Sequence, residues 1–194
     1  MKTELERVAP MDIERRSFEI IASELQHPVD AQLAPIILRV IHATADFDFA
    51  DTLCFSNDAL EKGLAAIRDG ATIITDTTMA QAGINKRLLA KHGGSARCFV
   101  ADEDVAEAAR RNGTTRSVEA MKKAATLPGK KIFAIGNAPT ALVQLYDMMQ
   151  EGRVQPELVI GVPVGFVNVV QAKELILQTD APYIVARGRK GGSN

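Results

Sequence analysis

Residues 131–142 read KIFAIGNAPTAL, an apolar run that leads directly into a helix start. Its first part, Lys131–Ile135, is a short apolar run, which predicts a strand buried on both faces. The following residues, Gly136-Asn137-Ala138-Pro139-Thr140, predict a turn and the start of a helix over Thr140–Gln150, because Asn137 can cap a helix and proline suits a first helical turn. A strand that leads directly into a helix is the repeating unit of an α/β fold.

The same alternation extends along the chain from Thr52. Strands are predicted at Leu53–Ser56, Ala71–Thr75, Ala96–Val100, Lys131–Ile135, Leu158–Val162 and Tyr183–Ala186. Helices are predicted at Asp58–Arg68, Ile84–Lys91, Glu103–Arg111, Ser117–Ala125, Thr140–Gln150 and Asn168–Leu177, with Gly70, Gly93, Gly113 and Gly152 where helices should end. Two more helices precede them, near Asp12–Leu25, with Asp12 as its N-cap, and from about Ala31 to Thr44. We therefore predict one α/β domain over residues 1–194, a three-layer α/β/α arrangement with a mainly parallel sheet and a two-helix N-terminal segment.

Composition excludes several classes of protein. The 194 residues include 23 Lys+Arg and 24 Asp+Glu, so there is no general basic field that would bind nucleic acid. No apolar run approaches the roughly 20 residues that span a bilayer. Cys54 and Cys98 are the only cysteines, which suits the reducing cytoplasm. Three scattered histidines and the lack of HExxH or CxxC spacing predict no protein metal site.

Candidate binding segments follow the predicted strands, because ligands of open parallel sheets bind beyond the carboxyl ends of the strands. These segments are Asp76-Thr77-Thr78, Gly136–Thr140, Pro163-Val164-Gly165-Phe166 and Arg187–Ser193. The free N–H groups of Gly136, Asn137 and Ala138 would attract an anion, although an ordinary capped helix start is the more probable interpretation. No GxGxxG or Walker A pattern occurs, so a nucleotide cofactor has weak support.

Two basic segments are further candidates. Arg187–Ser193 combines three cations with three glycines, which suits carboxylate or phosphate groups, whereas a frayed chain end is the alternative. Arg116-Ser117 begins a predicted helix, where the helix dipole mildly disfavours an arginine. An anionic ligand would compensate for this, and a surface arginine is about as probable.

His42 is the most informative single residue. On a helical wheel it lies roughly 180° from Leu33 and the apolar stripe, so it is not simply a core histidine of its helix. Arg39 lies three residues earlier and shares its face. The pair suits a general acid/base beside an anion-binding group, although an exposed pair without function is the better expectation from these residues alone.

Six blocks taken together resemble one family, and they extend over nearly the whole chain. They are Pro10, Ile13-Glu14 and Ser17-Phe18, then Arg39-Val40-Ile41-His42-Ala43, Thr114-Thr115-Arg116-Ser117, Ile135–Leu142, Gly161–Val167 and Arg187–Ser193. In this order they resemble the precorrin-8X and cobalt-precorrin-8 methylmutases of cobalamin biosynthesis. The family pattern usually continues past Gly192-Ser193 into a further helix.

The resemblance implies a flavodoxin-like α/β/α fold, a homodimer with active sites at the subunit interface, and an isomerase. The implied reaction moves a methyl group from C-11 to C-12 of a precorrin-8 macrocycle, gives hydrogenobyrinate or cobyrinate, and needs no cofactor. It implies that His42 is catalytic. The implied substrate-binding positions are Ser17, Arg39, Arg116, Ser117, Gly136, Asn137, Ala138, Gly165, Arg187 and Lys190.

Two other functions stay open at this point. A tetrapyrrole carrier of the same fold would share the pocket but would not need His42. A phosphate- or nucleotide-binding enzyme would use the Gly136–Thr140 helix start and the basic tail.

Overall fold

The computed structural model describes residues 5–193, which divide into two compact units with a boundary after Leu53. The first unit is helical. Its elements are η1 (Pro10–Asp12), α1 (Ile13–Glu24), α2 (Ala34–Thr44) and α3 (Phe49–Thr52), and α1 contacts α2. Asp12 makes no side-chain cap for α1, contrary to the sequence prediction, and pairs with Arg15 instead. Residues 31–33 form a turn, so α2 begins later than expected, with Pro35 in its first turn.

The second unit is built on a six-stranded sheet. The strands are β1 (Leu53–Phe55), β2 (Thr72–Thr75), β3 (Ser95–Cys98), β4 (Lys131–Ile135), β5 (Leu158–Gly161) and β6 (Tyr183–Ala186). Their order is β1-β6-β5-β4-β2-β3, and the pairs β2–β3, β2–β4, β4–β5 and β5–β6 are all parallel. Counted from β2, these five parallel strands have the order 2-1-3-4-5 of flavodoxin-like folds. The expected fold class is therefore confirmed.

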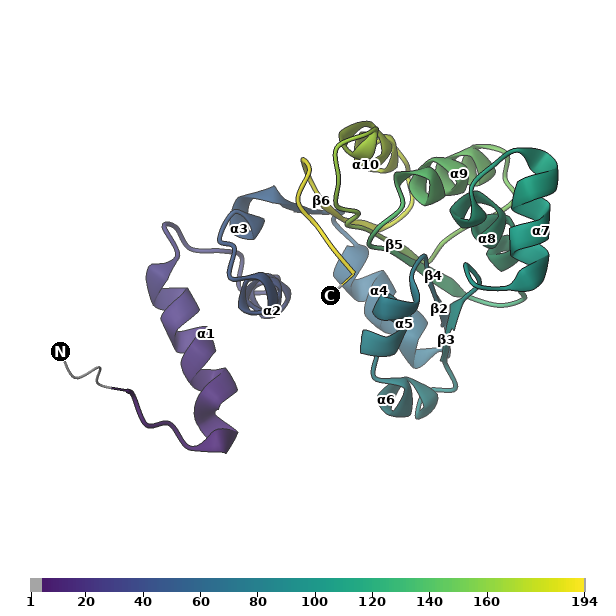
Figure 1. Cartoon of the computed structure of the whole chain (residues 1–194). Coiled ribbons are helices and arrows are strands. Elements are labelled where there is room, and N and C mark those ends of the chain that lie inside the picture. The colour runs from purple at the N-terminus through teal and green to yellow at the C-terminus, as the bar shows by residue number, and fades with distance from the viewer. Residues whose placement is uncertain (1–4, 194) are drawn as a thin grey trace. The chain divides into compact units, whose positions relative to one another are not determined.

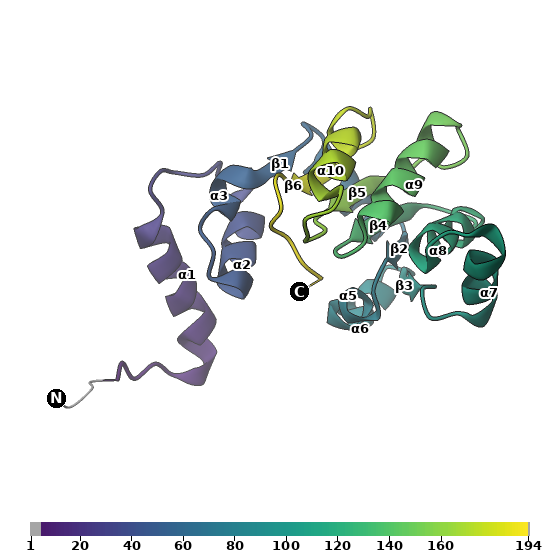
Figure 2. The same ribbon diagram turned by 45° about the horizontal axis from the view of Figure 1, so that its top comes forward.

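Helices cover both faces of this sheet (Figure 1). They are α4 (Ala59–Arg68), α5 (Thr78–Gly83), α6 (Lys86–Ala90), α7 (Glu103–Asn112), α8 (Arg116–Ala125), α9 (Pro139–Gln150) and α10 (Val169–Leu177). One face carries α8, α9 and α10, which pack side by side, and the other carries α4 with α5 and α6 (Figure 2). No helix in the described part of the chain has the length and apolarity needed to cross a bilayer.

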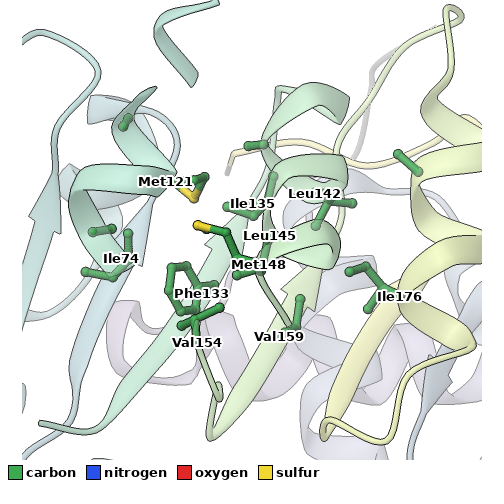
Figure 3. Close-up of a cluster of buried hydrophobic side chains, with 14 of the residues drawn as sticks. Ile74, Met121, Phe133, Ile135, Leu142, Leu145, Met148, Val154, Val159 and Ile176 are labelled. Atoms are coloured by element: carbon green, nitrogen blue, oxygen red, sulfur yellow. The ribbon is translucent and has the colours of Figure 1, made fainter. Parts of the chain in front are cut away.

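The core lies between the sheet and the α8–α10 layer. Side chains of α9, including Leu142, Leu145 and Met148, pack onto Phe133 of β4 and Val159 of β5 (Figure 3). All five are fully buried, and burying a side chain of this size contributes roughly 1.5–3 kcal/mol. This packing fixes the carboxyl ends of the central strands, and the loops that follow those ends are therefore built on a rigid base.

Candidate active site

In the first unit, α2 presents His42 and Arg39 on the side opposite its buried residues. Ile37 and Ile41 are buried, whereas His42 and Arg39 are exposed. Phe18 of α1 contacts both. Its ring meets the His42 ring edge to face, with centroids 5.5 Å apart, and the Arg39 guanidinium lies 5.0 Å from its centroid. The prediction that the two residues share a surface outside the core of α2 is confirmed.

Glu14 of α1 supplies a negative charge to this group, which we call the α1–α2 cluster (Glu14, Ser17, Phe18, Arg39 and His42). The Glu14 carboxylate pairs with Arg39, and the hydrogen bond and positive charge of Arg39 lower the pKa of Glu14, with a smaller contribution from the charge of His42. The Ser17 hydroxyl donates to the carbonyl oxygen of Ile13 at 2.9 Å. The guanidinium of Arg39 therefore has an anionic partner within the first unit.

In the second unit, the amides at the start of α9 are occupied by a buried carboxylate. Asp76, directly after β2, is 2% exposed, and its oxygens accept hydrogen bonds from the N–H groups of Gly136 at 2.9 Å, Asn137 at 2.9 Å and Ala138 at 2.6 Å. The more probable interpretation, a capped helix start, is therefore confirmed over amides that are free for an external anion, and the capping group is Asp76 rather than Asn137. The two loops lie at the switch point between the first and third parallel strands, where sheets of this order receive ligands.

The segment Arg187–Ser193 after β6 folds back along this edge rather than fraying. The N–H of Gly192 donates to the carbonyl oxygen of Val162 at 2.9 Å, and the Thr77 hydroxyl donates to that of Ser193 at 2.9 Å. A Cβ atom on Gly136 would lie 2.7 Å from the carbonyl oxygen of Gly192, so glycine is required for this approach. Figure 2 shows the yellow segment running from β6 toward the start of α5.

The arginines of this segment are held by neighbouring groups. Arg187 pairs with Glu174 of α10 at 3.5 Å. The Arg189 guanidinium lies 5.3 Å from the centroid of Phe166, and its carbonyl oxygen accepts from the N–H of Gly165 at 3.2 Å. Phe166 is 80% exposed. The structure thus brings the Gly165 loop and the basic segment together.

Arg116 and Ser117 begin α8, and a threonine pair connects this start to that of α9. The Thr115 hydroxyl accepts from the N–H of Val118 and lies 3.2 Å from the hydroxyl of Thr140. Arg116 is exposed and Ser117 is half-buried. The starts of these two helices are therefore neighbours at the carboxyl edge of the sheet.

Lys173 of α10 is a functional candidate that the sequence reasoning missed. Its side chain is 0% exposed, and its Nζ donates to the carbonyl oxygens of Gly188 at 2.9 Å and Lys190 at 2.7 Å. Desolvation by burial lowers the pKa of its ammonium group to about 8. The sequence feature that could have indicated this residue is a single cation within the apolar stripe of α10 formed by Val169, Ala172 and Ile176.

The structure places the predicted site residues in two separate groups. Ser17, Arg39 and His42 lie in the first unit, and the others lie along the carboxyl edge of the sheet in the second. A cavity of about 660 Å³ opens at the opposite, amino edge, beside Gln155, Glu157 and Asp180, and no predicted site residue lines it. Within residues 5–193, no group of three or more His, Cys, Asp or Glu side chains is arranged to hold a metal ion.

Comparison with known proteins gives consistent matches. The family model for precorrin-8X methylmutase matches residues 12–194. The cobalt-precorrin-8 methylmutase of Priestia megaterium is 46% identical over 96% of this chain and 83% of its own length. That of Salmonella typhimurium is 47% identical over 95% of this chain and 90% of its own length. A crystal structure of precorrin-8x methyl mutase from Thermus thermophilus superposes with a TM-score of 0.84 at 40% identity, covering 94% of this chain and 89% of the other.

Proposed function

Because the chain belongs to the precorrin-8X methylmutase family, we propose that it is an isomerase of cobalamin biosynthesis. The reaction moves a methyl group from C-11 to C-12 of the precorrin-8 macrocycle and gives hydrogenobyrinate, or cobyrinate when the ring carries cobalt. The observation on the molecule that supports this proposal best is the α1–α2 cluster, in which His42 and Arg39 share an exposed face around Phe18.

His42 is the catalytic residue of the proposal. The methyl group leaves one ring carbon and joins its neighbour, so the macrocycle is both donor and acceptor and the atoms balance without a second substrate. What the protein supplies is orientation and a favoured electronic state. A protonated imidazole donates a hydrogen bond to the nitrogen of ring C, which withdraws electron density from the rearranging part of the ring. The edge-to-face contact with Phe18 limits the rotation of His42 and aims its ring.

Each unit carries cations that suit the peripheral carboxylates of the substrate. In the first unit Arg39 binds a substrate carboxylate. Its present partner Glu14 is more than half exposed, so the substrate can compete with Glu14 for the guanidinium. In the second unit the substrate carboxylates bind Arg116, Arg187 and Lys190, together with Ser117 and the loop at Gly165. The backbone amides of Gly136, Asn137 and Ala138 bind Asp76, so these residues contribute to the site through the shape of the surface and not through hydrogen bonds to the substrate.

The substrate form to test first is cobalt-precorrin-8, because the relatives from Priestia megaterium and Salmonella typhimurium bear that name. Cobalt in this case is part of the substrate. We further propose that the enzyme needs no cofactor, since the migration requires neither a methyl donor nor an oxidant. Activity should therefore survive gel filtration into chelator-containing buffer. A cytoplasmic location agrees with the low cysteine content of the chain, in which Cys54 and Cys98 are the only cysteines.

The direct test is the absorption spectrum of the macrocycle during incubation with the purified protein. The unaltered protein should convert the precorrin-8 chromophore to that of the rearranged product. His42→Ala should bind the macrocycle but lose about 10²-fold or more of the turnover. The exposed His92 at the end of α6 provides a matched control, and His92→Ala should keep full activity. A carrier protein would change only the intensity of the spectrum, and an active His42→Ala would remove the imidazole from the mechanism.

We also propose that two copies of the chain form a homodimer whose active sites lie at the subunit interface. The support is the number of large apolar side chains left exposed in each unit, which a partner would cover: Met11 and Ile13 in the first, and Val164, Phe166 and Val167 in the second. Mixing His42→Ala with Arg116→Ala subunits, each of which we expect to be strongly impaired alone, tests this arrangement. If each site combines the first unit of one copy with the second unit of the other, exchange restores roughly a quarter of the activity. If each site belongs to a single copy, no activity returns.

A further inference from the structure

Lys173 is a fully buried lysine whose ammonium group is bound by backbone carbonyls. Its Nζ donates to Gly188 at 2.9 Å and to Lys190 at 2.7 Å, and its side chain is 0% exposed. Within residues 5–193, no carboxylate lies within ion-pairing distance of this Nζ, although Glu174 follows it in α10 and pairs with Arg187 instead. The two carbonyl dipoles are therefore its principal electrostatic partners.

These carbonyls belong to the segment Arg187–Ser193, which leaves the sheet after β6. Lys173 holds the segment from the side of α10, while Val162 and Gly165 of the preceding loop bind it through backbone hydrogen bonds. At Gly191 the fit is so close that a Cβ atom would lie 2.1 Å from the carbonyl oxygen of Val162. The two carbonyls bound by Lys173 lie on either side of Arg189, whose guanidinium stacks on Phe166.

Burying this charge is costly for the folded state. An ammonium group taken out of water loses several kcal/mol of hydration, and two carbonyl partners offset only part of that loss. A methionine of similar length would pack among Val169, Ala172 and Ile176 without the penalty. A lysine at position 173 is thus less favourable for the stability of the folded state than a methionine. What the lysine adds is two directed hydrogen bonds that a methionine cannot make.

We propose that Lys173 is a positioning residue, which fixes the Arg187–Ser193 segment in the conformation that binds the anionic macrocycle. It acts through the backbone of residues 188 and 190 and touches no reacting atom. Without its two hydrogen bonds, Arg187 and Arg189 lose their fixed spacing along the carboxyl edge, and substrate binding weakens while the methyl migration does not. This inference rests on the proposed function, because it takes the segment to be part of the substrate site.

Comparison of Lys173→Met with Lys130→Met in the full-length protein tests the proposal. Lys130 is a partly exposed lysine that pairs with Asp69 at 2.6 Å, so its replacement controls for the general loss of a cation. Hydrogen–deuterium exchange should accelerate by about tenfold or more at the amides of Gly165 and Gly192 in Lys173→Met, with the core strands unchanged. The KM for cobalt-precorrin-8 should rise by about tenfold with kcat within about twofold. The melting temperature should stay the same or rise. Lys130→Met should leave all of these values unchanged.

Three results would overturn the inference. Unchanged exchange at Gly165 and Gly192 would show that Lys173 does not anchor the segment. Faster exchange with an unchanged KM would show that the segment does not bind substrate. A fall in kcat with unchanged KM would mean that Lys173 serves the chemical step. Absence of turnover in the unaltered protein is a separate result, which contradicts the proposed function, and the exchange comparison then still decides whether Lys173 is an anchor.

Discussion

Replacement of Asp76 by asparagine should destabilise the second unit by about 3 kcal/mol. The substitution keeps the shape of the side chain but turns one accepting oxygen into an NH₂ group. One Asp76 oxygen accepts from both Asn137 and Ala138 and the other from Gly136, so the best placement of the new amide keeps its oxygen on the first two. These two bonds lose the charge of the acceptor, at about 1 kcal/mol each, and the buried N–H of Gly136 is left facing another donor, at about 1 kcal/mol or more.

Urea unfolding followed by tyrosine fluorescence measures this loss. The chain has no tryptophan, and both of its tyrosines, Tyr146 and Tyr183, lie in the second unit, so the signal reports on that unit. A loss of 3 kcal/mol corresponds to a fall in melting temperature of roughly 6–12 °C for a protein of this size. Asp69→Asn is the control, because Asp69 is an exposed partner of Lys130 and should cost less than about 0.5 kcal/mol. An equally small loss for Asp76→Asn would refute the assignment of Asp76 as the cap of α9.

Three further outcomes follow from the same structure. Burial lowers the pKa of Lys173 to about 8, so the folded chain loses this proton at a lower pH than the unfolded chain does. The free energy of unfolding should therefore rise by roughly 3 kcal/mol between pH 8 and 10.5, relative to that of Lys173→Met. Urea midpoints that change in parallel in the two proteins over this range would contradict the prediction. Gly191→Ala forces a methyl group against the carbonyl oxygen of Val162, so the Gly192 amide should lose its protection from exchange while the melting temperature changes by only a few degrees. Glu119→Ala leaves Asn112 and Thr114 without their buried acceptor, so the loop before α8 should loosen in exchange measurements and stability should fall by about 2 kcal/mol.

Most of the second unit could be predicted from sequence because its elements are bounded by strong local signals. The strands Lys131–Ile135 and Tyr183–Ala186 have the bounds that were expected, and Gly113 ends α7 in the left-handed conformation, as predicted. The short helices α3 and α5 were not predicted, since four to six residues are too few to show a helical period.

The site was only partly predictable for a different reason. The rule that ligands bind at the carboxyl ends of parallel strands selected loops that do meet at that edge of the sheet, and the wheel position of His42 separated it from the core of α2. The partner of the Gly136 amides could not be found in this way. Asp76 precedes Gly136 by 60 residues, and the two meet only because β2 and β4 are neighbours in the sheet. The sequence identifies groups that can bind an anion, but it does not show which of them already have a hydrogen-bond partner elsewhere in the chain.

Asp76 also closes the start of α9 to external anions. Inorganic phosphate and nucleotides are abundant in every cell, and a helix start at the switch point of such a sheet is where they ordinarily bind. Here the carboxylate of Asp76, a side chain of the protein itself, occupies that position. The amides of Gly136, Asn137 and Ala138 are thereby already satisfied within the chain and are not available to a phosphate group.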